Sequence, residues 1–426
     1  MHIGLDFGTT NSSLARLTGP AGDVELARFR LGDALTESFR SLLYLERLKE
    51  AGRTTIKSWA GPEGIERYLS ADDKGRLIQS LKSFLSSRSL QTTEIFGRRF
   101  QLEELIAKVL RDIRTHAEKQ FGAPVRGAVV GKPVRFVGSE STEEDDYAIG
   151  RLTVALHKAG FEHVSFEYEP VAAAYYYESS LDHDELIVIG DFGGGTSDFS
   201  LLRVGPSQRK AGNGPRVVLG NEGLPLAGDA FDAKIIRHLV SPVLGAGTEL
   251  NSNGKLLPVP NWVYFKLERW HHLSFLKSRE TMNMLKSVVK QALESDKIAA
   301  LVYLVEHELG YHLHRAVQKV KIGLSRHEAE VFHFSDGDVE LEASVTRAEF
   351  ELWIAEELAG VEEKVDALLA KTGVDAKDVD MVFLTGGSSF VPAVRRIFEA
   401  RFGANKIRTG DEFTSVARGL ALRAAE

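Results

Sequence analysis

The chain has 426 residues, 43% of them hydrophobic and 27% charged, which is ordinary for a globular protein of two or three domains. Its net charge of -7, with no long block of one sign, argues against nucleic-acid binding, and the absence of cysteine excludes disulfides and thiolate metal sites. With neither a signal-peptide pattern nor an apolar run of about 18 residues, a cytoplasmic protein without a membrane partner is expected.

The first predicted element is a β-hairpin at the amino terminus. Apolar residues alternate from Ile3 to Phe7, residues 8–13 form a turn rich in glycine and hydroxyl side chains, and a second strand follows. Further along, residues 102–120 predict a helix, because Leu105, Val109 and Ile113 recur on one face.

A second helix start is predicted at Glu169. Pro170 follows it, and proline forces the preceding residue into an extended conformation, so the carboxylate is presented from a fixed boundary. Two interpretations are open at this point. Glu169 is either a functional carboxylate or an ordinary acidic residue stabilised by the helix dipole.

A second hairpin repeats the first about half a chain later. The stretch VIGDFGGGTSDFSLLRV again runs from an apolar strand through Asp-Phe-Gly and a small-residue turn into a strand. Consecutive glycines let backbone N–H groups approach an anion. Asp6 and Asp191 each end the first strand of a hairpin, and their carboxylates would repel a phosphate unless a cation lay between them. The pattern therefore predicts phosphate together with Mg²⁺.

One such turn alone is unremarkable, but a matched pair indicates a duplicated fold. Two other nucleotide-binding classes are excluded by their missing motifs: no P-loop sequence is present, and no His-Arg-Asp loop precedes the Asp-Phe-Gly of a kinase.

The segment from Leu239 to Leu324 is rich in aromatic residues and histidine. It predicts either the core of a small helical subdomain or a surface for a protein partner. Within it, His307 and His312 are five residues apart, which would place them on different faces of one helix, so no zinc site is expected. The last elements are a strand over residues 381–384, a helix from Pro392 and a helix over residues 415–425.

Five motifs together resemble one family. The stretches GLDFGTTNS, DFGGGTSD, YEPVAAAYYY, LAGDAFD and FLTGGSSFVP are similar to the ATPase domain of the seventy-kilodalton heat-shock (DnaK-type) chaperones, in the actin and sugar-kinase superfamily. The stretches VVGKPVRF and GFEHVSFEYEP are closer to the short YegD-like branch. The resemblance implies an α/β, duplicated actin-like (ribonuclease H-like) fold, with two lobes around a nucleotide cleft and a subdomain inserted in each.

The resemblance also implies the site. Catalysis would rest on Glu169, which would orient water or act as a base, together with Asp6, Asp191 and Thr196. Mg²⁺ would be held by Asp6, Asp191 and Asp198 largely through water, and Asp198 would also orient water or K⁺. The residues implied for ATP or ADP are Gly8, Thr9, Thr10, Asn11, Gly193, Gly194, Gly195, Thr196, Gly228, Lys321, Ser325, Gly386, Gly387, Ser388, Phe390 and Asp411.

Two departures from the family pattern bear on affinity and catalysis. Ile322 and Phe390 stand where the family clamps adenine between two arginines, and Gln318 replaces a contacting glutamate. Apolar and aromatic faces can still hold a purine, but without cation–π contacts. The family's phosphate-activating lysine has no clear counterpart, and Arg67 is the candidate replacement. Slow turnover is therefore expected.

The implied organisation is lobe I over residues 1–185, with an insertion at about 39–120, and lobe II over residues 186–410, with an enlarged helical insertion at about 229–325. The carboxyl-terminal helix, at about 411–426, would pack back on lobe I, and no peptide-binding domain is expected. The favoured function is a slowly hydrolysing, Mg²⁺-dependent ATPase. Its nucleotide state would change lobe closure and contact with a protein partner, through the segment 239–324. A small-molecule kinase and an actin-like or nucleotide-binding scaffold are the alternatives.

Overall fold

The computed structural model describes residues 1–19, 23–50, 53–71, 75–179, 181–210, 218–269, 276–409 and 414–424. The chain forms two compact units. The first consists of Met1–Gly228, Ala359–Ser389 and Val394–Glu426, and the second of Asp229–Leu358 and Phe390–Ala393. The predicted boundary between lobes, at residue 185, falls within the first unit, so the assignment of lobes stays a prediction.

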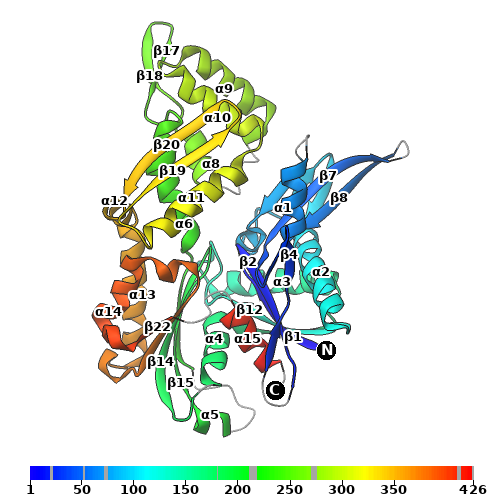
Figure 1. Cartoon of the computed structure of the whole chain (residues 1–426), viewed down its shortest axis with the longest axis vertical. Helices are drawn as coiled ribbons and strands as arrows, with labels where there is room; N and C mark the ends of the chain where they lie inside the picture. Colours follow the sequence, from blue (N-terminus) through cyan, green and yellow to red (C-terminus); the bar gives the residue numbers. More distant parts are fainter. Residues whose placement is uncertain are drawn as a thin grey trace. The chain divides into compact units, whose positions relative to one another are not determined.

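The first unit contains a mixed sheet built on the amino-terminal hairpin (Figure 1). Its central strand β1 pairs antiparallel with β2 and parallel with β12, in the order β13-β12-β1-β2-β3, and β6 also pairs with β2. The strands are β1 (His2–Phe7), β2 (Asn11–Leu17), β3 (Val24–Leu26), β6 (Phe39–Arg40), β12 (Gly127–Lys132) and β13 (His163–Tyr168).

A second sheet of the same unit repeats this arrangement. Its central strand β14 pairs antiparallel with the strand after it, β15, and parallel with a strand much later in the chain, β21, in the order β16-β15-β14-β21-β22. The strands are β14 (Glu185–Phe192), β15 (Ser197–Val204), β16 (Val218–Leu224), β21 (Met381–Thr385) and β22 (Ile407–Thr409). The predicted duplication of an α/β fold is confirmed by this shared order of strands.

Smaller elements lie between β3 and residue 102, most of them where the insertion was expected. A three-stranded sheet, β8-β7-β9, is accompanied by two hairpins, a helix and a 3-10 turn. They are β4 (Phe29–Leu31), β5 (Ala34–Thr36), β7 (Leu42–Glu50), β8 (Arg53–Ala60), α1 (Gly61–Ser70), β9 (Arg76–Gln79), η1 (Leu81–Phe84), β10 (Thr92–Ile95) and β11 (Arg98–Gln101).

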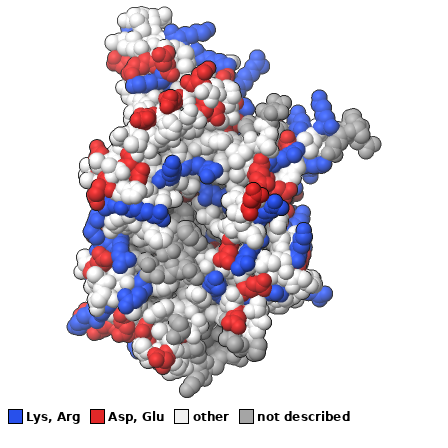
Figure 2. All heavy atoms as spheres, in the orientation of Figure 1, with Lys and Arg blue, Asp and Glu red and all other residues white. Residues whose placement is uncertain are grey.

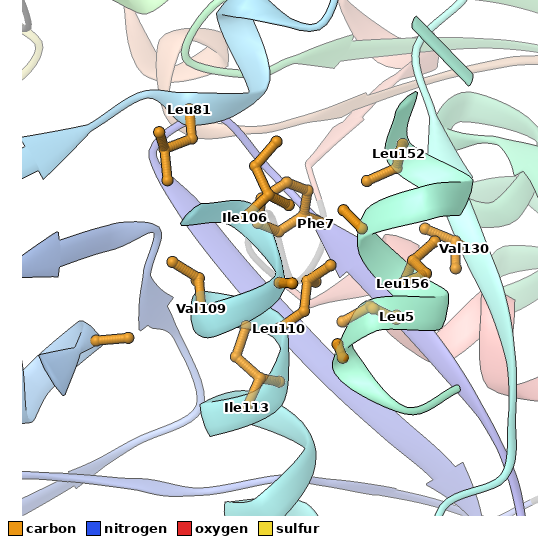
Figure 3. Packing of buried hydrophobic residues seen from close by; sticks show 14 of the residues in the cluster. Leu5, Phe7, Leu81, Ile106, Val109, Leu110, Ile113, Val130, Leu152 and Leu156 are labelled. Carbon is orange, nitrogen blue, oxygen red and sulfur yellow. The ribbon is translucent and has the colours of Figure 1, made fainter. Parts of the chain in front are cut away.

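Helices of the first unit cover its sheets and make its core. α2 (Leu102–Phe121) begins with a capping box between Gln101 and Glu104, and its predicted apolar face is confirmed, since Leu105, Val109 and Ile113 are buried. Figure 3 shows α2 side chains packed against Leu5 and Phe7 of β1, Val130 of β12, and Leu152 and Leu156 of α3 (Thr142–Ala159). The remaining helices are α4 (Glu169–Glu178), α5 (Pro206–Lys210), α13 (Ala355–Thr372), η4 (Ala376–Asp378), η5 (Gly387–Phe390), α14 (Pro392–Phe402), η6 (Ala404–Lys406) and α15 (Ser415–Arg423), of which α13, η5 and α14 begin or end in the second unit.

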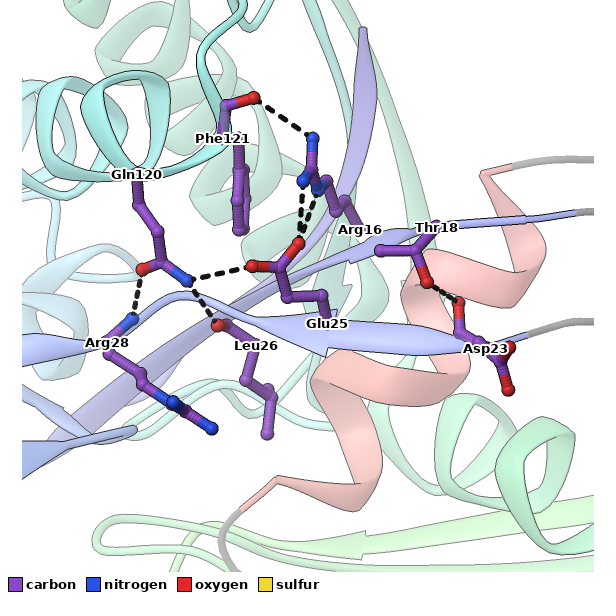
Figure 4. A network of polar contacts seen from close by, with 8 residues as sticks. All are labelled: Arg16, Thr18, Asp23, Glu25, Leu26, Arg28, Gln120 and Phe121. Carbon is purple, nitrogen blue, oxygen red and sulfur yellow. Dashed lines mark hydrogen bonds and ion pairs between the residues drawn. The ribbon is translucent and has the colours of Figure 1, made fainter.

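A polar network ties the β2–β3 edge to the end of α2 (Figure 4). Arg16 pairs with Glu25 at 2.7 Å, and the amide of Gln120 donates to Glu25 and to the carbonyl of Leu26. Burial opposes the charge of Glu25, but the hydrogen bonds from Arg16 and Gln120 hold the pKa of that carboxyl below its ordinary value. The network therefore fixes an otherwise exposed sheet edge.

The carboxyl-terminal helix α15 packs against β1 and α4, in the first unit. Small residues allow this approach. A Cβ on Gly4 would lie 2.2 Å from the backbone nitrogen of Ala421, and one on Gly419 would lie 1.6 Å from the carbonyl oxygen of Ala172 in α4. Backbone thus meets backbone, which joins the end of the chain to the elements that carry Asp6 and Glu169.

Gly419→Ala is expected to destabilise the first unit by on the order of 3 kcal/mol, because its methyl group overlaps a backbone carbonyl that cannot rotate away. Urea unfolding measures this loss. The matched control is Gly150→Ala in the exposed middle of α3, where nothing lies within 4 Å of the added Cβ and a gain of up to about 1 kcal/mol is expected. Equal stabilities of the two variants would contradict the close contact between α15 and α4.

The second unit is mostly helical, with two hairpins. Its elements are α6 (Gly228–Ile235), the π-helical turn η2 (Ile236–Val240), α7 (Ser241–Val243), β17 (Glu249–Ser252), β18 (Lys255–Pro258), α8 (Trp262–Glu268), α9 (Arg279–Gln291), α10 (Ser295–Glu306), α11 (Gly310–Leu324), β19 (Ala329–Asp336), β20 (Val339–Thr346) and α12 (Arg347–Trp353). His307 and His312 do not share a helix, because α10 ends at Glu306 and α11 starts at Gly310.

Of the aromatic residues in the segment 239–324, Tyr264 and Tyr311 are buried, whereas Trp262 and Phe265 are exposed. Residues 270–275 lie outside the described part of the chain. Basic and acidic side chains are interspersed over the face in view in Figure 2. Within the described ranges, no helix is both long and apolar enough to span a bilayer.

Candidate functional site

Two hairpin turns meet in the first unit. A Cβ on Gly195, in the turn between β14 and β15, would lie 3.2 Å from the hydroxyl of Thr9, in the turn between β1 and β2, and 3.6 Å from the hydroxyl of Ser83. Only a residue without a side chain fits this approach. Two segments almost 190 residues apart are therefore brought side by side, as the sequence predicts for a duplicated phosphate site.

Each turn is held by backbone hydrogen bonds. In the second turn the N–H of Gly193 donates to the carbonyl of Thr196 at 2.9 Å, and the N–H of Gly228 donates to that of Gly193 at 3.3 Å. In the first, the carbonyl of Thr10 accepts from Ser41 at 2.9 Å. The hydroxyl of Thr10 is buried and has no hydrogen-bond partner among the described residues, so the turn retains an unused polar group suited to an anion.

Buried charges lie beside these turns. The ammonium of Lys82, in η1, is 2.6 Å from a carboxylate oxygen of Glu169, and the two side chains are only 7% and 9% exposed. Burial opposes the charge of Lys82, but Glu169 and Asp6 raise its pKa above the ordinary value. Glu169 is the first residue of α4, so the predicted helix start is confirmed, but the extended residue is Tyr168 and not Glu169 as the proline rule predicted.

Three aspartates complete the cluster: Asp191 and Asp198 are buried and Asp6 is half-buried. Burial, and then the charge of Glu169, raise the pKa of Asp6 well above its ordinary value, and Lys82 only partly offsets them. Burial raises the pKa of Asp191 to about 6, although Thr385 donates its hydroxyl hydrogen to the Asp191 carboxylate at 2.7 Å. The pKa of Asp198 is also raised well above its ordinary value by burial, although this carboxylate accepts hydrogen bonds from Thr196 and from the N–H of Val134.

The donor set fits a hydrated divalent cation. Three buried carboxylates and the half-buried Asp6 lie around Lys82, so the described part of the site has an excess of negative charge once its aspartates ionise. Within the described ranges, no three acidic or histidine side chains are grouped so that they alone could hold a metal. Mg²⁺ suits this arrangement, because it keeps several waters and binds through one or two carboxylates together with phosphate oxygens.

The structure places Lys82, and not Arg67, against Glu169, so the interpretation of Arg67 is corrected. The sequence offered Arg67 as the replacement for a missing lysine, but its guanidinium lies on α1, pairs with Glu46 at 3.0 Å, stacks over Trp59 and is 44% exposed. Lys82 occupies the site instead. Sequence reasoning also missed Ser83 and the hydrogen bond from Thr385 to Asp191. The only local signal for Lys82 was its place inside the largely apolar run LIQSLKSFL.

The other expected nucleotide contacts fall into three groups. Gly386 packs against the backbone of Phe192, and Ser388 is buried nearby in sequence, in the first unit. Lys321 and Ser325 belong to the second unit, where Lys321 pairs with the buried Asp232 at 2.7 Å and Ser325 donates to the Lys321 carbonyl at 3.1 Å. Asp411 lies outside the described residues.

The two side chains at the adenine-clamp positions also belong to the second unit. Ile322 is 54% exposed and Phe390 is 45% exposed. Exposed apolar surface at both positions is compatible with stacking on a base, and neither position carries a charge that could replace the family's cation–π contacts.

The raised pKa of Asp191 makes the metal-free protein less stable as pH rises. The folded group ionises near pH 6 and the unfolded one near pH 4, so the cost of burying its charge is absent at low pH and complete above about pH 7. In EDTA, we compare the free energy of unfolding of Asp191→Asn with that of the unmodified protein. The difference is expected to shift in favour of the variant by roughly 1–2 kcal/mol between pH 5 and pH 7.5. Urea unfolding at the two pH values measures it.

Asp366→Asn is the matched control for this measurement. Asp366 is largely exposed, and its hydrogen bond to Arg401 lowers its pKa, so its replacement should bring no relative gain with rising pH. A stability difference for Asp191→Asn that stays constant or falls with pH would show that Asp191 is not a strained buried carboxylate.

Comparison with known proteins gives one family. A family model described as "Hsp70 protein" matches residues 74–254 and 299–425, together more than half of the chain. The stromal 70 kDa heat shock-related protein, chloroplastic, of Pisum sativum is 26% identical over 436 residues, an alignment that covers 99% of this chain and 52% of that protein. The chain thus spans about half the length of this curated relative.

Proposed function

Because the chain belongs to the Hsp70 family, whose members generally bind ATP or ADP with Mg²⁺, we propose that it is a chaperone-like ATPase with slow turnover. The observation that carries the proposal is the approach of Thr9 to Gly195 beside a buried lysine, three buried carboxylates and the half-buried Asp6. A phosphate chain lying along both turns would meet backbone N–H groups and hydroxyls from each hairpin.

Each residue of the site has a role in this proposal. The turn residues from Gly8 to Asn11 and from Gly193 to Thr196 bind the β- and γ-phosphates, and Asp6, Asp191 and Asp198 hold the waters of Mg²⁺. When bound, Mg²⁺ supplies charge neutralisation at the phosphate oxygens. Lys82 stabilises negative charge that develops on the transferred phosphoryl group, and Glu169 orients the attacking water while it holds the ammonium of Lys82 in place.

Slow turnover and modest adenine selectivity follow from the same residues. The buried pair Lys82–Glu169 limits the freedom of Glu169 to accept a proton, because its charge already serves the lysine. The exposed Ile322 and Phe390 offer only apolar stacking at the base. K⁺ beside Asp198, and a cytoplasmic location, stay expectations from the sequence.

Calorimetric titration with ATP, ADP, GTP and AMP, with and without Mg²⁺, tests the site. Mg²⁺-dependent binding of ATP and ADP is expected, with AMP bound at least about tenfold more weakly, since most of the proposed contacts are to the β- and γ-phosphates. Thr10→Val, which keeps the shape and removes the unused hydroxyl, should weaken ATP binding. Tight binding of AMP, or no binding of any nucleotide, would overturn the assignment.

The partner is proposed to be a protein that contacts the second unit. Among the described residues between 249 and 293, five large apolar side chains are exposed: Leu256, Leu257, Trp262, Phe265 and Leu293. Exposed apolar surface of this kind favours protein contact, and nucleotide state would govern it. Hydrogen-exchange rates of residues 239–269 should differ between the ATP-analogue state and the ADP state. They are measured on the samples used for the calorimetric titration. Identical exchange would favour the passive scaffold.

A further inference from the structure

The backbone that carries Lys82 is unusual at its start. Ser80, immediately before η1, has φ 52° and ψ 35°, in the left-handed region that side chains other than glycine rarely adopt. Ser80 is fully buried, and its hydroxyl has no hydrogen-bond partner among the described residues. A strained, buried residue persists only where its surroundings hold it.

The turn itself is short and leaves carbonyls to be satisfied. The N–H of Ser83 donates to the carbonyl of Ser80 at 3.0 Å, and that of Leu85 donates to the carbonyl of Lys82 at 3.2 Å. Leu81 and Leu85 are buried in the core of the first unit. These anchors direct Lys82 away from the core, toward Glu169. The N–H of Ser87 donates to the carbonyl of Phe84 at 3.2 Å, but the carbonyls of Leu85, Ser87 and Leu90 still need donors.

Arg151 of α3 supplies those donors. Its side chain is 6% exposed, and the Nε of its guanidinium pairs with a carboxylate oxygen of Glu103 in α2. The guanidinium donates to four backbone carbonyls that follow Lys82, those of Phe84, Leu85, Ser87 and Leu90, at 3.2, 3.4, 3.0 and 3.0 Å. One planar group thus fixes seven consecutive residues, and only a guanidinium has enough donors to do so.

We propose that Arg151 is a positioning residue for Lys82, holding the strained turn that presents the ammonium to Glu169, Asp6, Asp191 and Asp198. The catalytic meaning of this role depends on the proposed ATPase function, whereas the placement of Lys82 does not. Loss of the guanidinium leaves the buried carbonyl of Leu85 and the partly buried carbonyls of Ser87 and Leu90 without this donor, and the left-handed Ser80 then relaxes.

Amine labelling of the nucleotide-free protein tests the placement. Reductive methylation of Lys82, followed by peptide mass spectrometry, should be slow in the unmodified protein and faster by on the order of tenfold in Arg151→Gln, because the open turn becomes more populated. Arg151→Lys, which can keep one or two of the carbonyl bonds, should give an intermediate rate. Lys234, another largely buried, ion-paired lysine, is the internal reference and should not change.

The matched control is Arg114→Gln. Arg114 also donates to a backbone carbonyl next to α3, that of Gly160 at 2.9 Å, but it does not touch the Lys82 turn. A second test variant is Ser80→Val, because a β-branched residue disfavours φ 52° while leaving Arg151 intact. It should raise the labelling of Lys82 as Arg151→Gln does.

Hydrolysis gives the second readout. In Arg151→Gln, kcat should fall by on the order of 10²-fold with KM for ATP within a few-fold, since a displaced lysine affects the reaction more than ground-state binding. The proposal would be overturned if Lys82 were labelled as slowly in both Arg151→Gln and Ser80→Val as in the unmodified protein. It would also be overturned if the labelling of Lys234 rose as much as that of Lys82. If the unmodified protein hydrolyses no ATP while Lys82 labelling responds as described, the proposed function fails and the positioning role stands.

Discussion

Lys82→Met is expected to lower kcat for ATP hydrolysis by on the order of 10²- to 10³-fold, while ADP still binds. Methionine fills the same space but removes the ammonium that lies 2.6 Å from a Glu169 oxygen, among the buried Glu169, Asp191 and Asp198 and the half-buried Asp6. Charge that develops on the transferred phosphoryl group would then be left without this stabilisation. Single-turnover hydrolysis measures the effect apart from nucleotide binding.

Arg67→Met is the matched control for Lys82→Met, because sequence alone would favour Arg67 for the same role. Its guanidinium pairs with Glu46 and stacks over Trp59 on a partly exposed helix face, so hydrolysis should change less than about twofold. A large loss in Arg67→Met, with activity retained in Lys82→Met, would reverse the assignment that the structure supports.

Glu169→Gln is expected to slow hydrolysis by about 10²- to 10⁴-fold and to leave Mg²⁺-ATP affinity largely intact. Glutamine keeps the shape and can still accept the hydrogen bond from Lys82, but it removes the charge that orients water. Calorimetry and single-turnover rates on the same preparation separate the two effects.

Glu178→Gln, at the other end of α4, controls for the loss of a buried carboxylate. Glu178 accepts the N–H of Gly205 at 2.8 Å, and glutamine can accept the same bond, so hydrolysis should stay near that of the unmodified protein. Normal hydrolysis by Glu169→Gln would contradict its catalytic role. Because Lys82 and Glu169 touch, the double variant should lose less than the product of the two single losses.

Local patterns were sufficient for much of the fold. The two hairpins, the helix over residues 102–120 and the helix start at Glu169 each depend on residues close in sequence, such as alternating apolar side chains, an apolar stripe or a following proline. The duplication was visible because both copies keep the same turn. Asp6 and Asp191 were found because each ends a strand of that pattern.

The lysine of the site, Lys82, could not be found from such local patterns. A lysine in a short turn has no local signature, and Lys82 becomes significant only because α4 and two hairpins bring Glu169, Asp6 and Asp191 to it. Arg67 was the better candidate by sequence, since nothing in its neighbours reveals that Glu46 and Trp59 already engage it.

The sequence by itself therefore determined the strand-turn-strand units, their repetition and the residue types that suit phosphate and Mg²⁺. Tertiary structure alone decided which side chains share the site, that Thr385 donates to Asp191, and that Arg151 holds the turn of Lys82. The physical reason is that secondary structure follows from interactions a few residues apart, whereas burial, pKa and charge pairing arise from groups far apart in the chain that become neighbours only on folding.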